Sequence, residues 1–393
     1  MDNFTFYAPT YFDFGIDKEQ NVGKLVRRFG GSKVLLHYGG GSIIKSGLYD
    51  RVINCLKEEG IEVVALGGVK PNPRSGLVYE GIDLCRRENV DFILAVGGGS
   101  TIDSAKAIAA GTLYDGDFWD FHQGKAIEKA LPIGTVLTIA AAGSEGSPNC
   151  VITKEEGMLK RGAKSDVLRP KFSILNPALT MTLPPYQSAA GITDIMIHIM
   201  ERYFTTTEDV EATDRLCEGL LKTMISEGKK VMKNPQDYHA RANIMWCGML
   251  AHNNVCGVGR NQDWASHGLE HELSALYDVA HGAGLAVMAP VWLRYVLEKK
   301  PERLVSFAVR VWNIDLDMND LHGTAIKGIE AFENFLKEIG MPTSFAEIGA
   351  KREDIPVMAE KIIKSKGSLG GYVKLNKEDI IAIYEMADDR NQS

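Results

Sequence analysis

The stretch DFILAVGGGSTIDSAKAIAA, residues Asp91–Ala110, begins as an apolar run of strand length and passes through three glycines into a helical pattern. A strand, a glycine turn and a helix in this order are typical of an α/β sheet with parallel strands. Glycines have no Cβ, so phosphate oxygens could reach the backbone N–H groups there, and the dipole of the following helix favours negative charge. The stretch therefore predicts a fold class together with an anion-binding loop. The loop residues are Gly97, Gly98, Gly99, Ser100 and Thr101.

Other apolar runs of strand length surround this stretch in the first half of the chain. They are Lys33–Tyr38, Ile61–Leu66, Ile133–Thr138 and Phe172–Leu175. The segments Ser46–Glu59 and Gly76–Glu88, which lie between such runs, have apolar residues at helical spacing. Strands that are apolar on both faces and separated by helices predict a Rossmann-like parallel sheet with helices on each side.

The second half of the chain has a different period. After Leu183, Pro184 and Pro185, apolar residues recur at helical spacing without further β-branched runs. The clearest helical segments are Glu208–Val231, Tyr238–Val255, Leu321–Ile339 and Lys377–Met386. We therefore expect an α/β dinucleotide-binding domain over residues 1–185 and an all-helical metal-binding domain over residues 186–393.

The composition is that of a soluble globular protein and narrows its partners. Of the 393 residues, 45% are hydrophobic and 24% charged, and the net charge of −7 leaves no basic surface for nucleic acid or an anionic membrane. No apolar stretch reaches the length of a membrane span, and the N-terminus has no signal-peptide pattern. The six cysteines form no CxxC motif, which is typical of reduced thiols. We therefore expect a cytoplasmic protein with no nucleic-acid or membrane partner.

Another glycine loop follows the run Lys33–Tyr38, and it consists of Gly39, Gly40, Gly41 and Ser42. In chain order, residues 39–42 are called the first glycine loop and residues 97–101 the second. Neither has the third glycine of the dinucleotide fingerprint, because Ile44 and Ile102 stand at that place. One such loop is most simply a tight turn. Two loops at the carboxyl ends of predicted parallel strands favour a dinucleotide, which needs one site for its pyrophosphate and another for its adenosine ribose.

The segment AAGITDIMIHIMERYF, Ala189–Phe204, carries an acid and a histidine in apolar surroundings. Asp194 and His198 are four residues apart, which places both on one face of a helix, close enough to bind one ion. A buried carboxylate and imidazole must be paired or liganded. This pair alone is better explained by a hydrogen bond between the two side chains.

Three further histidines, His267, His271 and His281, change that balance. With Glu270, the first two spell H-x-x-E-H, the motif of inverted zinc peptidases. On a continuous helix His281 would lie roughly 20 Å from His267, so the chain must turn between them if both bind one ion, and we expect that turn in the segment Tyr277-Asp278-Val279. Two metal sets therefore stay open. One takes His267, His271 and a downstream carboxylate, and the other takes Asp194, His198, His267 and His281.

Together these residues resemble the iron-containing alcohol dehydrogenase family over essentially the whole chain, in order and with matching spacing. The matching features are GGGSTIDSAK (Gly97–Lys106), TIAAAGSE (Thr138–Glu145), Asn149, GITDIMIH (Gly191–His198) and HGLEHELSALYDVAHG (His267–Gly282). YGGGS at Tyr38–Ser42 and QDWASH at Gln262–His267 are similar to the branch of butanol dehydrogenases and aldehyde reductases. The resemblance implies a dehydroquinate synthase-like architecture with an α/β and an all-α domain.

The resemblance also implies the reaction and the metal ligands. Asp194, His198, His267 and His281 would hold one divalent ion, Fe(2+) or Zn(2+), with His271 beside it. Hydride would pass between a nicotinamide cofactor and a small, mainly apolar primary alcohol or aldehyde such as butyraldehyde, with the positive centre polarising the substrate oxygen. The alternatives are a metal- and NAD-dependent lyase of the dehydroquinate synthase kind and an H-x-x-E-H zinc peptidase.

Roles for further residues follow in part from the resemblance. Asp103, Thr138, Asn149 and Lys160 are the predicted cofactor contacts in addition to the two glycine loops. Thr138 is the remaining hydroxyl there, because Ala140-Ala141-Ala142 stands where a threonine-rich run is common in the family. Asp103 is alternatively a first-turn acid that matches the helix dipole. Lys160, in the polar turn Glu155–Arg161, is alternatively an exposed loop lysine.

Two residues near the predicted metal ligands have roles of their own. His271 is the candidate catalytic proton relay, because an imidazole titrates in a useful range, and its alternative is a core histidine bonded to a carbonyl. Trp264 is expected to wall an apolar substrate pocket, and its alternative is simple packing.

The first glycine loop also predicts the cofactor. NAD enzymes commonly place an acid against the ribose 2′-hydroxyl, and members of this family that prefer NAD resemble one another in carrying an aspartate at the head of this loop. Here that place is Gly39 or Gly40, and Ser42 and Lys45 offer a hydroxyl and a cation suited to a phosphate. We expect NADP(H) to be preferred and NAD(H) to be the alternative. We also expect a homodimer.

Overall fold

The computed structural model describes residues 1–389. Contacts divide the chain into two compact units. The sheet unit is Tyr7–Leu183, and the helical unit joins Met1–Phe6 to the chain from Pro184 onward. The predicted α/β and all-helical classes are confirmed. The observed division falls after Leu183, close to the expected boundary at residue 185, but residues 1–6 group with the helical unit and not with the sheet unit.

The first residues are attached to the helical unit through the backbone. The amide of Asp2 donates to the carbonyl oxygen of Gly259 at 2.8 Å. The N-terminal ammonium of Met1 donates to the carbonyl oxygen of Glu208 at 3.0 Å. Nothing in the apolar pattern of residues 1–6 could have shown this attachment.

The sheet unit is built on a parallel sheet with strand order β1-β8-β5-β4-β2-β3. Its strands are β1 (Tyr11–Phe14), β2 (Lys33–Tyr38), β3 (Glu62–Leu66), β4 (Phe92–Gly97), β5 (Ile133–Leu137) and β8 (Phe172–Leu175). The sequence predicted each of these except β1. That strand is short and lies at an edge, so its pattern is only partly apolar.

An antiparallel hairpin of β6 (Asn149–Lys154) and β7 (Leu159–Lys164) was also missed. Its sequences are NCVITK, which has only three consecutive apolar residues, and LKRGAK, in which lysines and an arginine separate the apolar ones. Such a pattern is weaker than the continuous apolar runs of the central strands.

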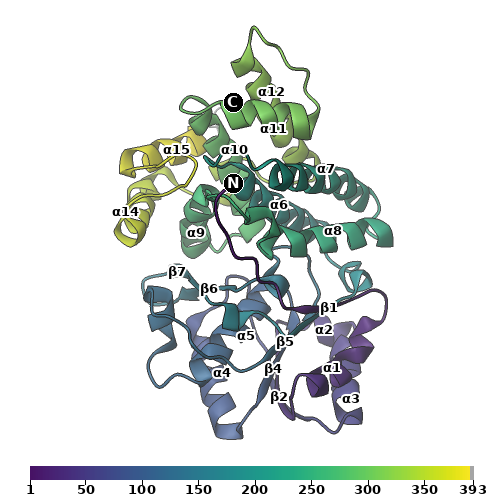
Figure 1. The fold of residues 1–393 in the computed structure, drawn as a ribbon. Coiled ribbons are helices and arrows are strands. Elements are labelled where there is room, and N and C mark those ends of the chain that lie inside the picture. Colours follow the sequence, from purple (N-terminus) through teal and green to yellow (C-terminus); the bar gives the residue numbers. More distant parts are fainter. Residues whose placement is uncertain (390–393) are drawn as a thin grey trace. The chain divides into compact units, whose positions relative to one another are not determined.

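Helices cover both faces of the sheet, with α1 and α3 on one side and α4 and α5 on the other (Figure 1). The helices of this unit are α1 (Val22–Arg28), α2 (Ser42–Lys45), α3 (Leu48–Glu58), α4 (Ser75–Glu88) and α5 (Gly99–Thr112), with short 3-10 turns η1 (Lys18–Asn21), η2 (Phe118–Gln123), η3 (Ser144–Gly146), η4 (Asp166–Leu168) and η5 (Pro177–Thr180). Alternate strand residues serve the two faces: Val34 and Leu36 join the core with α1 and α3, whereas His37 points to Ser104 of α5. Burial on both faces explains why the strand runs are continuously apolar.

The helical unit consists of helices and short turns throughout its described part. They are α6 (Pro185–Tyr203), α7 (Glu211–Lys233), α8 (Tyr238–His252), η6 (Val255–Gly257), α9 (Ala265–Tyr277), α10 (His281–Leu297), α11 (Glu302–Trp312), α12 (Leu321–Glu338), α13 (Phe345–Ile348), η7 (Arg352–Asp354), α14 (Ile355–Lys366) and α15 (Lys377–Asp389). Helix α6 is buried from Gly191 to its end and packs against α7, α8 and α10. It begins at Pro185, where a missing N–H costs nothing.

Two further observations concern membrane-spanning helices and cysteines. Within residues 1–389, no helix combines the length and apolar character needed to cross a membrane. All six cysteines are free.

Candidate metal centre and nucleotide-binding loops

Helix α6 presents one predicted pair of ligands from its buried face. Asp194 and His198 are one helical turn apart, and their exposed fractions are 3% and 4%. The Nε2 atom of His198 lies 3.3 Å from Oδ1 of Asp194. The spacing therefore places both side chains at one point in the interior.

The other two predicted ligands come from α9 and α10. His267 lies in the first turn of α9, and His281 is the first residue of α10. Between them the chain turns as predicted: α9 ends at Tyr277, and Asp278 has the left-handed conformation with φ of 53°. The turn brings Nε2 of His267 and Nε2 of His281 each within 3.7 Å of Oδ1 of Asp194.

These four side chains fit a divalent ion. The ligand atoms of Asp194, His267 and His281 all lie within 4.8 Å of one another, and His198 reaches the same aspartate oxygen. Oδ1 of Asp194 and Nε2 of His267 are buried and have no hydrogen-bond partner in the described part of the chain. Three imidazole nitrogens and one carboxylate oxygen suit Fe(2+) or Zn(2+), either of which would satisfy these atoms. We propose below that they hold such an ion.

Two buried glutamates, missed by the sequence analysis, contact the far sides of these rings. Glu201 accepts a hydrogen bond from Nδ1 of His267 and, through its other oxygen, one from the His267 backbone N–H at 3.0 Å. Glu270 contacts Nδ1 of His281. Helical spacing held a signal for both, because Glu201 is three residues after His198 and Glu270 three after His267.

The surroundings move the pKa values of the two central histidines in opposite directions. Burial would lower the pKa of His267, but the neighbouring carboxylates of Glu201 and Asp194 outweigh it and raise the pKa to about 9. Burial, together with the nearby imidazoles of His252 and His267 and the guanidinium of Arg202, holds the pKa of His198 well below its ordinary value. A divalent ion bound by His267 would take the place of a proton on its ring.

His271 lies beside the four predicted ligands. It is half-buried, and its ring centroid is 6.3 Å from that of His267 and 5.9 Å from that of His281. It forms a possible ligand group with Glu270 and His281, not with Asp194. Within the H-x-x-E-H motif, Glu270 is engaged with His281.

Trp264 packs directly against the metal centre. Its ring centroid is 5.3 Å from that of His267 and 5.8 Å from that of His198, and the guanidinium carbon of Arg202 lies 4.6 Å from it. Trp264 has a φ of 65°, a left-handed conformation that is rare for a bulky residue. The ring therefore covers the ligand histidines and also stacks on a cation.

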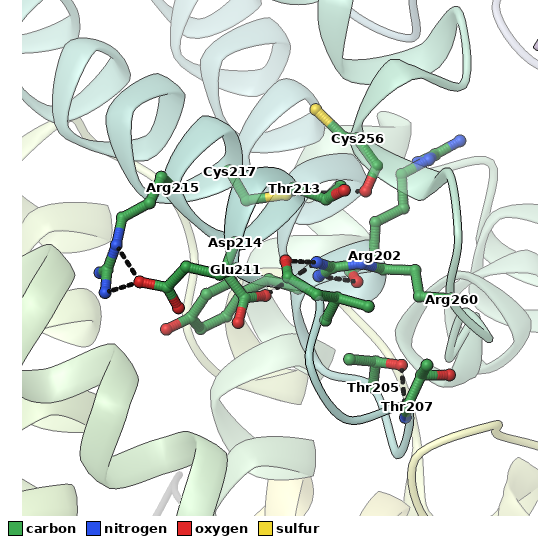
Figure 2. A network of polar contacts seen from close by, with 12 residues as sticks. Arg202, Thr205, Thr207, Glu211, Thr213, Asp214, Arg215, Cys217, Cys256 and Arg260 are labelled. Carbon is green, nitrogen blue, oxygen red and sulfur yellow. Dashed lines mark hydrogen bonds and ion pairs between the residues drawn. The ribbon is translucent and has the colours of Figure 1, made fainter. Parts of the chain in front are cut away.

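The segment between α8 and α9 holds α9 against the end of α6. The guanidinium of Arg260 donates to the carbonyl oxygen of Arg202 at 3.1 Å and pairs with Asp214 at 2.8 Å (Figure 2). The amide of Asp263 donates to the carbonyl oxygen of Glu201 at 2.8 Å. These bonds fix the position of His267 relative to α6, and Arg260 and Asp214 were not singled out in the sequence.

The second glycine loop lies where β4 passes into α5. Gly97 ends the strand, Gly98 caps the helix, and Gly99 is its first residue. A Cβ at Gly98 would lie 2.1 Å from Cγ2 of Ile139, and one at Gly97 would lie 2.4 Å from Oγ1 of Thr101. The backbone is packed too closely there for any side chain.

The first glycine loop lies next to the second. A Cβ at Gly39 would contact the carbonyl oxygen of Val69 at 3.5 Å and Oγ1 of Thr101 at 3.8 Å. Gly41 precedes the short helix α2, which begins at Ser42. A Cβ at Gly40 would meet no atom within 4 Å. The structure thus brings the two loops together at one edge of the sheet, with open space at Gly40.

The other predicted cofactor contacts near the second loop take part in protein hydrogen bonds. Asp103 accepts from Oγ of Ser144 at 2.6 Å and from the amide of Val151 at 2.9 Å. The amide of Thr138 donates to the carbonyl oxygen of Gly97 at 3.0 Å. Asn149 begins β6. These residues therefore shape the segments around the loop.

Lys106 organises the same region and was missed as a site residue. Its ammonium is fully buried and donates to Ser144, Ser147 and the carbonyl oxygen of Asn149, at 2.7 to 3.4 Å. Burial lowers the pKa of Lys106 to about 8, although the carboxylate of Asp103 opposes this effect. A lysine in the otherwise apolar run AKAIAA, residues 105–110, was the available signal.

Lys160 does not lie in a turn. The turn ends at Met158, and Lys160 is the second residue of β7. It is 4% exposed, and its ammonium donates to Oδ1 of Asn72 at 3.0 Å. The placement in a polar turn was wrong, because the hairpin was not recognised, and so was the alternative of an exposed loop lysine.

Comparisons with known proteins agree with this geometry. Residues 9–177 match the family described as iron-containing alcohol dehydrogenase, and residues 188–387 match the C-terminal family of Fe-containing alcohol dehydrogenases. The chain is 41% identical to NADH-dependent butanol dehydrogenase A of Clostridium acetobutylicum, over 98% of this chain and 99% of the relative. It is 38% identical to the NADPH-dependent aldehyde reductase YqhD of Escherichia coli, over 92% and 93%. The crystal structure of NADH-dependent butanol dehydrogenase A from Thermotoga maritima matches with a TM-score of 0.95 and 43% identity, over 99% of each chain.

Proposed function

The chain belongs to the iron-containing alcohol dehydrogenase family, and we propose that it is an NAD(P)-dependent alcohol dehydrogenase or aldehyde reductase acting on small, mainly apolar primary alcohols or aldehydes. The observation that carries this proposal is the convergence of three imidazole nitrogens on one oxygen of Asp194. Butanol dehydrogenases and an aldehyde reductase among the relatives support the reaction class.

We propose that Asp194, His198, His267 and His281 hold one divalent ion, Fe(2+) or alternatively Zn(2+). When bound there, the ion would polarise the substrate carbonyl, and the nicotinamide cofactor would supply the hydride. Asp194 offsets one of the two positive charges and orients the site. His271, half-buried beside the ligands, is placed to exchange a proton with the substrate oxygen and with solvent.

The alternatives explain less of the structure. A lyase for an anionic sugar would need a cleft lined with cations, whereas Ile195, Met196 and Ile199, which flank Asp194 and His198 along α6, are apolar and buried. The peptidase set leaves Asp194 and His198 without a role. The Glu270 carboxylate that a peptidase would use contacts His281 instead.

We propose that the glycine loops bind the cofactor, together with Asp103, Thr138, Asn149 and Lys160. We further propose that NADP(H) is preferred over NAD(H). Gly40 has open space and no charge that would repel a 2′-phosphate, and Ser42 and Lys45 follow it on the exposed helix α2. Relatives carry both NADH and NADPH in their names, so the residues of this loop are the basis of the proposal.

We propose a cytoplasmic homodimer. Free, mostly buried cysteines support a reducing compartment. Four aromatic side chains near the N-terminus are 40% to 53% exposed, namely Phe4, Phe6, Tyr7 and Tyr11. The strand β1 lies at an edge of the sheet. The exposed aromatic side chains and the edge strand each offer a surface on which a second copy of the chain can dock. Sedimentation at several concentrations measures the mass in solution, and a monomer throughout would contradict the dimer.

The function is tested by following nicotinamide absorbance with butyraldehyde. We expect turnover with the Fe(2+)-loaded or Zn(2+)-loaded protein, loss of turnover after removal of the metal with a chelator, and recovery when the metal is restored. Turnover that persists in chelator-treated protein shown to be metal-free would overturn the proposal.

The cofactor preference is tested by Gly40→Asp. A carboxylate at this open position would accept a hydrogen bond from the ribose 2′-hydroxyl and repel a 2′-phosphate. We expect the ratio of kcat/KM for NADPH over NADH to exceed one in the natural chain and to fall below one in the variant. A natural chain that favours NADH would show this proposal to be wrong.

A further inference from the structure

The two outer glutamates are placed to control which nitrogen of each ligand histidine is free. A neutral imidazole has one N–H and one bare nitrogen, and only the bare nitrogen binds a metal. Nδ1 of His267 is engaged by Glu201 and Nδ1 of His281 by Glu270. A carboxylate accepts hydrogen bonds, so each Nδ1 carries a proton, and in the neutral, metal-binding form of each ring Nε2 is the bare nitrogen, directed at Asp194.

Glu201 has a stronger hold on its histidine than Glu270 has. One oxygen of Glu201 accepts from the His267 ring, and the other accepts from the His267 backbone N–H at 3.0 Å. The same residue on α6 therefore fixes both the main chain and the side chain of a ligand on α9. Glu270 contacts the ring of His281 with one oxygen and accepts from Oγ of Ser274 with the other.

His198 provides the contrast among the three histidines. Its Nδ1 is buried without a hydrogen-bond partner in the described chain. Its carbonyl oxygen accepts from Nη1 of Arg202 at 2.7 Å, and its ring packs against that of His252 with a centroid distance of 4.2 Å. Its position comes from the rigid helix α6, on which Asp194 also lies. The two histidines on other helices are the ones that have carboxylate partners.

We propose that Glu201 and Glu270 are positioning residues that determine how tightly this chain retains its divalent ion, and that Glu201 contributes more. The inference rests on the proposed metal centre, because it assigns a role to residues behind its ligands. The contacts of Glu201 and Glu270 described above are with His267, His281 and Ser274, and not with Asp194. Each acts through a histidine, as partners behind metal ligands commonly do, where their loss costs about 10- to 100-fold in metal affinity.

Glu201→Gln and Glu270→Gln are the informative variants, because they keep the shape of the side chain. A glutamine has one accepting oxygen, and its NH2 group can only donate. If the NH2 group faces Nδ1 of the histidine, it either opposes the Nδ1–H group or favours the tautomer with its proton on Nε2, which cannot bind the metal through Nε2. Glu218→Gln is the matched control. Glu218 is likewise buried, at 5% exposure, on α7 of the same unit, and it bonds Tyr203 and Arg215 rather than a ligand histidine.

The experiment measures Zn(2+) affinity of the full-length, metal-stripped proteins by competition with a chromophoric chelator. We expect Glu201→Gln to weaken binding by about 30- to 100-fold, Glu270→Gln by about 10- to 30-fold, and Glu218→Gln by less than 2-fold. The visible spectrum of the Co(2+)-loaded proteins should change for the first two variants only. Thermal unfolding of the metal-free proteins checks that each variant is folded. If Glu201→Gln does not fold, the affinity of Glu270→Gln tests the proposal.

The outcomes separate this inference from the metal centre itself. If Glu201→Gln and Glu270→Gln bind Zn(2+) within 2-fold of the natural chain, the positioning role is overturned while the centre stands. If Glu270→Gln loses more affinity than Glu201→Gln, the argued order is wrong. If Asp194→Ala also binds like the natural chain, the proposed centre fails, and the inference fails with it.

Discussion

The proposed metal centre and the glycine loops are built from opposite parts of the polypeptide. At the proposed metal centre, side chains from α6, α9 and α10 converge, with buried carboxylates behind two of them. At the second glycine loop the absence of side chains permits the close packing of the backbone, since a Cβ at Gly98 would overlap Ile139. We expect the metal centre to fail when an atom is removed, and the second glycine loop to fail when one is added at Gly98.

The two sites also differ in exposure to solvent. Three of the four proposed ligands, Asp194, His198 and His267, are buried with exposed fractions of 3% to 6%, and His281 is half-buried. Residues 40–42 of the first glycine loop are exposed. A resident ion suits the buried cluster, whereas a cofactor that leaves in every cycle suits an accessible loop. The predictions below test this contrast.

The largest effect is expected from removing a donor at the metal centre. Alanine at Asp194, His198, His267 or His281 should each weaken metal binding by more than about 100-fold, because a direct ligand matters more than its outer partner. His271→Ala should retain the metal, since its ring lies outside the Asp194 group. Metal content after dialysis against a chelator measures this.

The same series distinguishes the two metal sets of the sequence. If His271→Ala loses the ion while His281→Ala keeps it, the peptidase-like set is right. The assignment of Asp194, His198, His267 and His281 as the metal ligands is then wrong.

An intermediate effect is expected from adding one methyl group to the second glycine loop. Gly98→Ala forces Cβ to within 2.1 Å of Cγ2 of Ile139, a branched side chain with little freedom, and overpacking of this kind costs about 1–3 kcal/mol. Urea unfolding should show that loss in the free energy of unfolding, and fluorescence titration should show weaker NADPH binding as the loop shifts.

Gly40→Ala is the matched change in the first glycine loop. Its Cβ would meet no atom within 4 Å, so the free energy of unfolding should change much less than in Gly98→Ala. An equal loss at both positions would mean that close packing does not explain the second loop.

The effect that is smallest at pH 7, and grows only on acidification, concerns histidines of the sheet unit that stay uncharged. Burial lowers the pKa of His37 and of His122 to about 4 each, although their contacts with the carbonyls of Leu66 and Arg161 oppose it. Below pH 6.5 the unfolded chain binds protons that the folded unit does not, so the free energy of unfolding should fall as the pH drops from 6.5 towards 4. The loss is about 1.4 kcal/mol per pH unit for each histidine, and it is absent above pH 6.5.

Urea unfolding of the natural chain and of His37→Gln at pH 7 and pH 5 measures this slope. His37→Gln should show a smaller difference between the two pH values, and the exposed His322→Gln should not change it. His122→Gln serves as the second variant if His37→Gln is unstable at pH 7. Equal slopes in all these proteins would contradict the neutral state of the buried rings.

Prediction from sequence succeeded where a local repeat carried the information. The runs at β2, β4 and β8 are apolar on both faces, and the four-residue spacing of Asp194 and His198 places them together on any helix. It failed where the pattern was mixed, as in the polar hairpin that contains Lys160. It also missed Lys106. The acceptor atoms that make its burial possible lie on residues 144–149, some forty residues away along the chain, and no local pattern indicates them.

The sequence by itself determined the two classes of fold, the glycine turns and the candidate ligands, since each depends on neighbours within a few turns of the chain. Only the tertiary structure decided which atoms meet. It turned the chain after Tyr277 so that His281 joins Asp194, and it placed Glu201 behind His267 across sixty-six residues. Hydrogen bonds and ion contacts act over a few ångströms, and the path of the backbone sets those distances, whatever the separation along the chain.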